Sequence, residues 1–367
     1  MAKIKILVFP HDNNPYQKEL YGNMPPAEVE FRYLKKPTNS RFFNALMAPF
    51  QLFWPRLLGY RILHIHWLHT LSLPGSRKSS AVAFASMTNM YFFVFLASLL
   101  NYKVVWTVHN ILPHAKLSAN DLGVRKYLAT KAALLIVHTD YTKQQLEESD
   151  ISSVKAITIP HGNYCDAYPN SVDRLEARAK LGIEKDVIVL LFLGSVQRYK
   201  GVDLLTEAFT SIHRQDAMLL IAGRCSDAEL DRQLRNECEK SSRIVYENKF
   251  IPDDELQIYF NAADYSVLPF RKITTSGSAL LSLSFGVPII APAIGAINDF
   301  PDGVGVLYNE TDVAGLKDSI NKAINFSVSK TKHLKENALA HAKDLNWASI
   351  SELTCDVFCK LLEKNVN

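Results

Sequence analysis

Short, largely apolar runs alternate with longer amphipathic segments along most of this chain. In the first half the apolar runs fall at residues 4–9, 29–33, 62–66, 103–108, 134–138 and 154–159. Segments with helical character, at 16–23, 81–100 and 141–149, lie between some of them. Because a strand that is apolar on both faces must be covered on both faces, this alternation is typical of a parallel sheet flanked by helices. The first half therefore predicts a doubly wound α/β domain.

The alternation is interrupted between residues 160 and 171, where Pro, Gly and Asn are frequent. It restarts after a polar helical segment at 172–180. Further strands are expected at 187–193, 217–222, 244–250, 265–268, 288–291 and 305–308, and further helices at 202–212, 311–325 and 334–345. We therefore expect a first doubly wound domain over 1–165 and a second over 170–345, facing each other across a cleft. Such a cleft is a usual place for a ligand.

The net charge of the chain is small. Its 367 residues carry 41 Lys and Arg against 37 Asp and Glu, a net charge of +4. This balance, without any basic run, argues against a nucleic-acid partner. The five cysteines form no Cys-x-x-Cys pair, which is typical of reduced thiols in a cytosolic protein. The first residues read as a strand, being too short and too charged for a signal peptide.

Two apolar segments of the first half raise the question of a membrane. Residues 81–100 are almost entirely apolar and about long enough to span a bilayer. A spanning helix would split the α/β domain, so a buried or surface-docked helix is favoured. Residues 41–61 are rich in aromatic side chains with flanking arginines, which suits either a membrane interface or a lid or core helix interrupted by Pro49 and Pro55. We expect a cytoplasmic protein in peripheral contact with the inner face of the cytoplasmic membrane.

A turn with two cationic side chains follows the predicted strand at 187–193. It begins at Gly194, carries Arg198 and Lys200, and leads into the helix at 202–212. Doubly wound domains bind ligands at the carboxyl ends of their strands, and Arg and Lys can hold an anionic group there. On a turn elsewhere these two side chains would be ordinary solvated charges. The position between a buried strand and a helix favours a diphosphate site.

A second turn is a candidate for the same diphosphate site. It contains two hydroxyl side chains before a glycine and one after it: Thr275, Ser276, Gly277 and Ser278. The turn opens a helix, where free backbone N–H groups and the helix dipole attract an anion, and Gly277 allows the backbone to approach it closely. The same residues also read as an ordinary N-cap, and both roles are compatible. Together the two turns predict a clamp for a nucleoside diphosphate.

Several polar residues of the first domain are candidates for chemistry. His109 ends the strand at 103–108 and could bond a sugar hydroxyl or move a proton, or it could serve packing alone. His66 and His114 are weaker candidates for the same role. Asp12 follows the first strand and could deprotonate an acceptor hydroxyl, although a role as a turn residue or helix cap is also open. No pattern of metal ligands is visible, so no metal is expected.

The chain resembles the glycosyltransferases with two Rossmann-like domains, the GT-B architecture. Within them it is similar to family 4 and to bacterial exopolysaccharide and capsule transferases. The resemblance covers nearly the whole chain and is strongest at residues 193–201, 263–269, 286–292 and 107–110. It implies that His109 touches the donor sugar, that Asp264 is structural and that residues 346–367 form a helix crossing back to the first domain. It also implies a metal-independent transferase without a cofactor, with a nucleoside diphosphate sugar as co-substrate.

The sequence departs from the family pattern at the donor site. Family 4 members usually carry two glutamates eight residues apart before a Gly-x-Pro motif, and here those places hold Ile273 and Leu281. Ser195 stands where many members have an arginine whose charge Arg198 could replace. Because the glutamates contact the donor sugar in that family, their absence leaves open an inverting transferase in which a first-domain carboxylate or histidine is the base.

We therefore expect transfer of a sugar from a GDP- or UDP-linked donor to a hydroxyl of a glycan or polyprenyl-linked glycan, in bacterial surface polysaccharide synthesis. Two alternatives stay open. One is a sugar-nucleotide epimerase on the same architecture. The other is a non-catalytic subunit that binds nucleotide sugar or glycan without turnover, which the missing glutamates favour.

Overall fold

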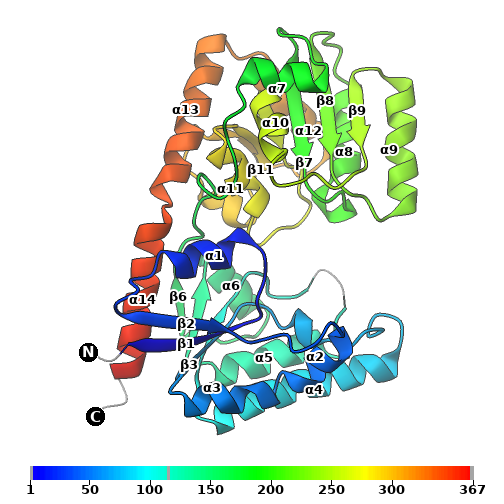
Figure 1. Cartoon of the computed structure of the whole chain (residues 1–367). Helices are drawn as coiled ribbons and strands as arrows, with labels where there is room; N and C mark the ends of the chain where they lie inside the picture. Colours follow the sequence, from blue (N-terminus) through cyan, green and yellow to red (C-terminus); the bar gives the residue numbers. More distant parts are fainter. Residues whose placement is uncertain (1–2, 114–115, 364–367) are drawn as a thin grey trace. The chain divides into compact units, whose positions relative to one another are not determined.

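The computed structural model of the chain describes residues 3–113 and 116–363 (Figure 1). These residues form two compact units. Unit 1 comprises the chain up to Gly162 together with the segment from Trp347 on, and unit 2 runs from Asn163 to Asn346. The first boundary thus lies slightly before the expected range of 165–170, and the carboxyl-terminal segment belongs to unit 1.

Unit 1 contains a sheet of six parallel strands in the order β2-β1-β3-β4-β5-β6. The strands are β1 (Ile4–Phe9), β2 (Val29–Tyr33), β3 (Ile62–Ile65), β4 (Lys103–Thr107), β5 (Leu134–Val137) and β6 (Ala156–Thr158). Its helices are α1 (Pro15–Gly22), α2 (Arg41–Met47), η1 (Phe50–Leu52), α3 (Phe53–Leu57), η2 (His69–Leu71), α4 (Ser80–Leu99), α5 (Asp121–Lys131), α6 (Asp140–Glu148) and α14 (Trp347–Glu363).

The side chains of β1 alternate between two apolar layers, as the period of a strand requires. Leu7 and Phe9 pack in the layer that contains the buried face of α4. Ile6 and Val8 pack on the opposite face, with residues of α1 and α14. The sheet is therefore covered on both faces, as the apolar runs predict.

The last helix, α14, is part of the core of unit 1. The indole ring of Trp347 lies so close to Gly162 that a Cβ atom on this glycine would collide with it. Ser351 Oγ donates a hydrogen bond of 2.8 Å to the carbonyl oxygen of Leu20 in α1. Glycine is therefore required at residue 162 for α14 to pack in this way.

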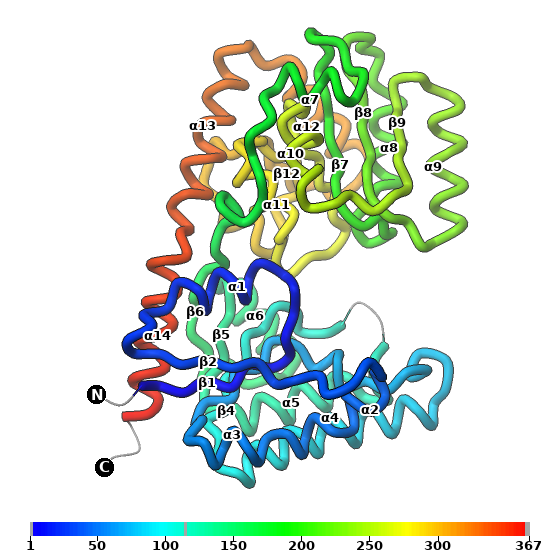
Figure 2. Tube along the Cα trace, in the orientation of Figure 1, coloured from blue at the N-terminus to red at the C-terminus, as the bar shows by residue number. Residues whose placement is uncertain are grey.

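The apolar helix α4 is docked on unit 1 along one face. Residues such as Met90 and Phe93 are buried, and Asn89 Nδ2 donates to the carbonyl oxygens of Ala45 and Leu71 at 3.0 and 3.1 Å. Among the described residues, α4 is the one helix long and apolar enough to cross a membrane by length and composition. Its buried face makes it a helix of the domain, as favoured from the sequence, and Figure 2 shows its path beside α3 and α5.

Unit 2 contains a second sheet of six parallel strands, in the order β12-β11-β10-β7-β8-β9. The strands are β7 (Ile188–Leu193), β8 (Ala217–Ala222), β9 (Ile244–Glu247), β10 (Tyr265–Val267), β11 (Ile289–Pro292) and β12 (Gly305–Tyr308). The helices are α7 (Arg174–Leu181), η3 (Arg198–Lys200), α8 (Val202–Thr210), α9 (Ala228–Lys240), α10 (Leu256–Ala262), α11 (Gly277–Ser284), η4 (Gly295–Asp299), α12 (Val313–Ile324) and α13 (Val328–Asp344).

The strand order of unit 2 reverses at β7, which lies between β8 and β10. In open parallel sheets a ligand binds outside the carboxyl ends of the strands at such a reversal, because the loops there diverge and leave a crevice. The turn that begins at Gly194 and the segment that follows β10 both leave the sheet at this point. The fold therefore indicates a ligand site at the carboxyl ends of β7 and β10.

Candidate functional site

The backbone after β7 is tightly packed around two glycines. Gly194 has a φ of +134° and Gly201, which directly precedes α8, a φ of +70°. A Cβ atom on Gly201 would collide with the carbonyl oxygen of Pro269, which follows β10. Glycine is therefore needed at residue 201 for the turn after β7 to lie against the segment after β10.

The two turns singled out from the sequence meet above Gly194. A Cβ atom placed on this glycine would lie 3.5 Å from Lys200 Nζ and 4.0 Å from Ser278 Oγ. Ser276 is buried and caps α11, because its hydroxyl accepts a hydrogen bond of 3.0 Å from the Ala279 N–H. The Lys200 ammonium, the Ser278 hydroxyl and the amino end of α11 therefore converge on one small volume of unit 2.

Lys200 is a largely buried cation without a counter-charge. Desolvation lowers the pKa of its ammonium group to about 8. Within the described residues, no hydrogen bond or ion pair of this ammonium group is found, whereas buried charges are normally paired. A perturbed pKa beside a helix amino terminus is typical of a functional site. An anion bound there would supply the missing partner.

Arg198, the second cation of the turn, has different surroundings. Its Nε donates a hydrogen bond of 2.8 Å to Asp227, and about half of its side chain is exposed. This bond is the main reason that the pKa of Arg198 is raised. Arg271 holds the same turn by donating to the Arg198 carbonyl oxygen at 2.6 Å and by a bidentate pair with Asp203. The structure therefore places Lys200, rather than Arg198, beside Gly194 and Ser278.

The two residues in the places of the family glutamates are partly buried and pack against the core of unit 2. Ile273 and Leu281 both lie against buried apolar clusters. Ser195 is exposed and Thr275 is partly buried. Unit 2 therefore has apolar side chains in the positions where the family pattern has carboxylates.

Unit 1 contains a cluster of buried and partly buried histidines at the carboxyl edge of its sheet. His66, His109, His138 and His161 follow β3, β4, β5 and β6, and their rings surround Tyr16 at centroid distances of 4.8 to 5.6 Å. His109 also stacks on Trp67 at 4.5 Å. We call these four rings with His64 the histidine cluster. Its regular place, one ring after each of four consecutive strands, was a signal in the sequence that the analysis of single residues missed.

A chain of hydrogen bonds connects the buried side chains of this cluster. Tyr21 Oη lies 2.7 Å from His64 Nδ1 and 2.8 Å from His66 Nε2. His64 Nε2 lies 2.7 Å from Thr107 Oγ1, and His66 Nδ1 lies 3.2 Å from His109 Nε2. Because a hydroxyl has one proton to donate, Tyr21 couples the tautomers of the two rings that it touches. The tautomer of His109 is thereby tied to Tyr21 of α1, a residue not predicted to have a role.

The histidines of the cluster are uncharged at neutral pH. Desolvation lowers the pKa of His64 to about 3 and that of His138 to about 4, and desolvation followed by the effect of His138 lowers the pKa of His109 well below 6.5. His138 Nδ1 donates to the Ile159 carbonyl oxygen at 3.0 Å, which leaves Nε2 as an acceptor. This Nε2 is buried and has no hydrogen-bond partner among the described residues. An uncharged imidazole can accept a proton from a substrate.

Asp12 occupies the turn between β1 and α1. Its Oδ1 accepts a hydrogen bond of 2.9 Å from the Asn14 N–H, and its own N–H donates to Gln17 Oε1 at 3.0 Å. The structure thus shows the turn role of this residue and leaves the side chain partly exposed. His114 lies outside the described residues. Among those that are described, no group of three or more His, Cys, Asp or Glu side chains is arranged to hold a metal ion.

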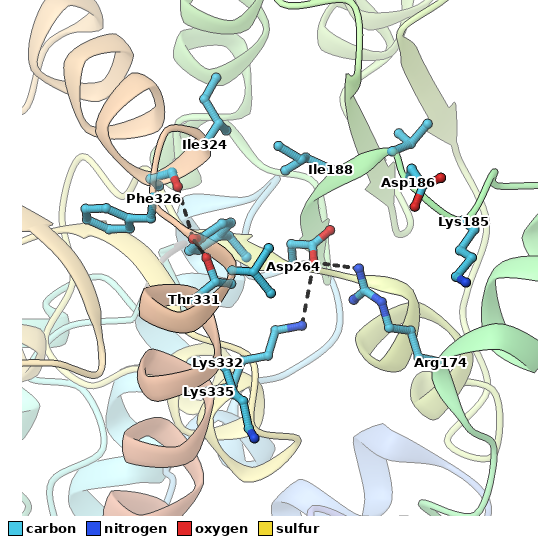
Figure 3. A pocket seen from close by; sticks show the side chains of 14 residues that line it. Arg174, Lys185, Asp186, Ile188, Asp264, Ile324, Phe326, Thr331, Lys332 and Lys335 are labelled. Carbon is cyan, nitrogen blue, oxygen red and sulfur yellow. Dashed lines mark hydrogen bonds and ion pairs between the residues drawn. The ribbon is translucent and has the colours of Figure 1, made fainter.

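A cavity of about 380 Å³ lies at the opposite, amino-terminal edge of the sheet of unit 2 (Figure 3). Asp264 at its wall accepts from Arg174, Arg178 and the Val189 N–H at 2.6, 2.8 and 2.9 Å, and Lys335 lies 3.6 Å away. Each of these cations therefore lies beside a carboxylate, whereas no carboxylate lies beside Lys200 in the described part of the chain. Asp264 links α7, β7 and α13, which is a structural function.

Comparisons with known proteins show which proteins the chain is similar to. Residues 187–325 match the family described as "Glycosyl transferases group 1". A "GDP-mannose:glycolipid 4-beta-D-mannosyltransferase" of Xanthomonas campestris pv. campestris is 25% identical over 284 residues, which are 77% of this chain and 70% of that protein. A "D-inositol 3-phosphate glycosyltransferase 1" of Catenulispora acidiphila is 29% identical over 204 residues, 52% of this chain and 48% of that protein.

Solved structures share the fold over nearly the full length. Sucrose-phosphate synthase from Thermosynechococcus elongatus superposes with a TM-score of 0.74 at 17% identity, covering 99% of this chain and 100% of that one. HepE of Anabaena, solved in complex with UDP, superposes with a TM-score of 0.71 at 15% identity, covering 98% and 100%. The chain therefore has the GT-B fold, and residues 187–325 of unit 2 form a domain of the family described as glycosyl transferases group 1.

Proposed function

We propose that the protein transfers a sugar from a nucleoside diphosphate sugar to a hydroxyl of a glycan or lipid-linked glycan, in the synthesis of a bacterial surface polysaccharide. The observation that carries this proposal is Lys200, a desolvated cation that has no partner among the described residues and lies beside Gly194 and the amino end of α11. A diphosphate there would accept from the Lys200 ammonium, the Ser278 hydroxyl and free N–H groups of α11.

Lys200 would also stabilise the charge that develops on the leaving diphosphate. Donors placed beforehand at the point where charge appears lower the barrier, because they need no reorganisation during the reaction. In this proposal Lys200 and the dipole of α11 take the part that a bound metal ion plays in other transferases, so the reaction is metal-independent. Activity that is unchanged by EDTA is the expected result.

The acceptor and the proton transfer are assigned to unit 1. His109 is a candidate base, since it is uncharged at neutral pH, and Asp12 is the other candidate. The donor is GDP- or UDP-linked: the relative from Xanthomonas is named for GDP-mannose and the Anabaena structure holds UDP. The name of the former also contains a glycolipid acceptor, which supports a lipid-linked acceptor here.

We also infer that the protein is cytoplasmic and that unit 1 makes peripheral contact with the inner face of the cytoplasmic membrane. Large apolar side chains of α2, η1, α3 and α4 are exposed, among them Phe43, Phe50, Phe53, Trp54, Leu57, Phe84, Phe92 and Phe95. The ring of Phe50 lies 5.8 Å from that of Phe92, so the exposed residues of η1 and α4 adjoin. Exposed patches of this kind mark protein or membrane contacts, and aromatic side chains are typical of a lipid interface.

An assay of nucleoside diphosphate release tests the function. The full chain is incubated with GDP-mannose or UDP-glucose and a lipid-linked glycan acceptor, beside a Lys200→Met variant. Acceptor-dependent release that is lost in the variant is expected. Donor consumption without any acceptor would favour the epimerase, and nucleotide binding without turnover would favour a non-catalytic subunit. The packed Ile273 and Leu281 are the observation that supports the latter.

A further inference from the structure

Unit 1 contains a cavity of about 550 Å³ at the carboxyl ends of β1 and β2. We call it the basic cavity. Phe9 and Pro10, at the end of β1, and Leu34, directly after β2, contribute to its wall. Arg41, Asn44 and Ala48 line it from α2 and its carboxyl-terminal end, as the spacing of one helix face allows. The cavity therefore lies at the sheet edge where a doubly wound domain binds its ligands.

The polar wall of the basic cavity carries only one sign of charge among the described residues. Lys35, Lys36 and Arg41 line it, together with His11 and His69, and no Asp or Glu does. No ion pair to the three cations is found in the described part of the chain; Arg41 donates a hydrogen bond of 3.0 Å to Ser72 Oγ. Such uncompensated cations make an anionic ligand favourable.

The sequence around the cavity is also rich in basic residues. Residues 31–120 contain ten Lys and Arg and not one Asp or Glu. With 41 basic and 37 acidic residues in the whole chain, the remainder carries 31 basic against 37 acidic ones. The positive charge of the protein is thus concentrated in the segment that builds the basic cavity. A segregation of this kind raises the local concentration of anions at that surface.

An unpaired hydroxyl also lines the cavity. Thr70 Oγ1 is buried and has no hydrogen-bond partner among the described residues. A buried polar atom without a partner destabilises the fold, and a bound group that accepts a hydrogen bond from it would remove this cost. A phosphate oxygen is such an acceptor. The cavity thus combines three cations with a neutral donor that lacks a partner.

The helix that lines the cavity, α2, also exposes apolar side chains. Arg41 and Asn44 line the cavity, whereas Phe42, Phe43 and Met47 of the same helix are exposed. Phe50, Phe53 and Trp54 follow directly in the chain and are exposed as well. A ligand with an anionic head and a long apolar chain matches this sequence of surfaces, because its head would meet the cations and its chain the aromatic side chains.

We propose that the basic cavity binds the phosphate or diphosphate group of a lipid-linked acceptor, whose apolar chain lies on the exposed side of α2. This proposal rests on the proposed function, since it places the acceptor of that reaction. It also accounts for the position of Asp12: this carboxylate follows β1 as the cavity residues Phe9, Pro10 and His11 do. The glycan attached to the diphosphate would then begin beside one of the two candidate bases.

Calorimetric titration of the full chain with geranyl diphosphate, a soluble short-chain prenyl diphosphate, tests this assignment. The variant is Lys35→Gln with Lys36→Gln, and the control is Lys322→Gln with Lys330→Gln, two exposed lysines of unit 2. A loss of about tenfold or more in affinity is expected for the first variant and less than about twofold for the control. Inorganic pyrophosphate should bind more weakly than geranyl diphosphate, since it lacks the apolar chain.

A parallel titration with GDP and UDP separates this proposal from the proposed function. Lys200→Met should weaken nucleotide binding and leave the binding of geranyl diphosphate unchanged, and the Lys35 and Lys36 double variant should do the reverse. Geranyl diphosphate binding that is equal in the double variant and the wild type would overturn the acceptor site. Equal affinity for pyrophosphate and geranyl diphosphate would overturn the lipid-linked assignment. Nucleotide affinity that is equal in the Lys200→Met variant and the wild type would refute the donor site and leave the basic cavity standing.

Discussion

Replacing Lys200 by methionine is expected to weaken nucleotide binding while stabilising the free protein. Methionine keeps an unbranched side chain of similar length, so the change removes the charge with little loss of packing. In the fold this charge is desolvated and lacks a partner among the described residues. A residue retained for its folding contribution would show the opposite pattern, a loss of stability.

The size of the two effects follows from the surroundings of Lys200. The lowering of its pKa from 10.5 to about 8 corresponds to roughly 3 kcal/mol of penalty in the folded state at neutral pH, an upper limit for the gain in the variant. A charge-assisted hydrogen bond to a phosphate contributes about 1.5–3 kcal/mol, so the dissociation constant of GDP or UDP should rise about 10- to 100-fold.

The pH dependence gives a second check on Lys200. The unfolded chain keeps this proton up to about pH 10.4 whereas the folded chain loses it near pH 8, so between these values the unfolded state binds more protons and the stability of the wild type rises with pH. The variant lacks this contribution. Nucleotide affinity should fall as pH rises through about 8, because the ammonium form is the one that binds.

Urea denaturation and calorimetric titration measure both quantities on the same samples, with Lys330→Met, an exposed lysine of unit 2, as the control. The account requires a higher urea midpoint and weaker nucleotide binding in the Lys200 variant, and neither change in the control. Unchanged nucleotide affinity in the Lys200 variant would refute the diphosphate site. A lower urea midpoint would refute the description of Lys200 as a destabilising cation.

Three further predictions concern unit 1. Tyr21→Phe leaves two buried ring nitrogens of the histidine cluster without a partner and should cost about 1–3 kcal/mol per nitrogen in the free energy of unfolding, measured in urea. Below pH 6.5 stability should fall by up to about 1.4 kcal/mol per pH unit for each cluster histidine, because two of these rings have pKa values of about 3 and about 4 in the fold and near 6.5 when unfolded. Changing Phe50, Phe53 and Trp54 together to Ser should abolish flotation with anionic liposomes, because it removes exposed aromatic area.

Matched controls decide each of these outcomes. Tyr33→Phe alters a partly buried tyrosine outside the hydrogen-bonded chain, and an equal effect of both tyrosine variants would contradict the role of Tyr21. A urea midpoint that is the same at pH 7.5 and pH 5 would contradict the uncharged cluster. For the membrane prediction, the control is the same change to Ser at Leu175, Phe250 and Val328, three exposed apolar residues of unit 2. Flotation that persists after Phe50, Phe53 and Trp54 are changed would contradict the proposed surface.

The strands were largely predictable from the sequence. β1, β2, β8 and β12 have the bounds that the apolar runs indicate, because strands covered on both faces need apolar side chains throughout. The helices α5 and α9 were not predicted. Each buries few apolar side chains, such as Leu230 and Leu234 in α9, so the helical period is weak in the sequence. Their existence depends on the sheet on which they pack.

The candidate donor site was predictable in part. Glycine and cations directly after an apolar run identify the turn, and a Ser- and Gly-rich turn identifies the start of α11. The partner of Arg198 was not predictable, because Asp227 lies after the next strand and no local sequence pattern connects the two residues. The ammonium of Lys200 and the guanidinium of Arg198 differ in their surroundings only because the chain places one inward and the other at the surface.

The histidine cluster shows what analysis of single residues leaves out. His64 lies within β3 and is buried in the core. His109 was weighed alone, whereas the structure ties it to His66 and Tyr21 through hydrogen bonds. These bonds depend on α1 packing over the sheet edge, which no local pattern specifies. The recurrence of histidine after four consecutive strands was visible in the sequence and indicates a shared environment.

A crystal structure of the full chain with GDP or UDP tests the central claim most directly. The account predicts diphosphate oxygens within hydrogen-bond distance of Lys200 Nζ and of N–H groups at the amino end of α11. A nucleotide bound instead in the cavity beside Asp264, or with its phosphates remote from Gly194, would contradict it.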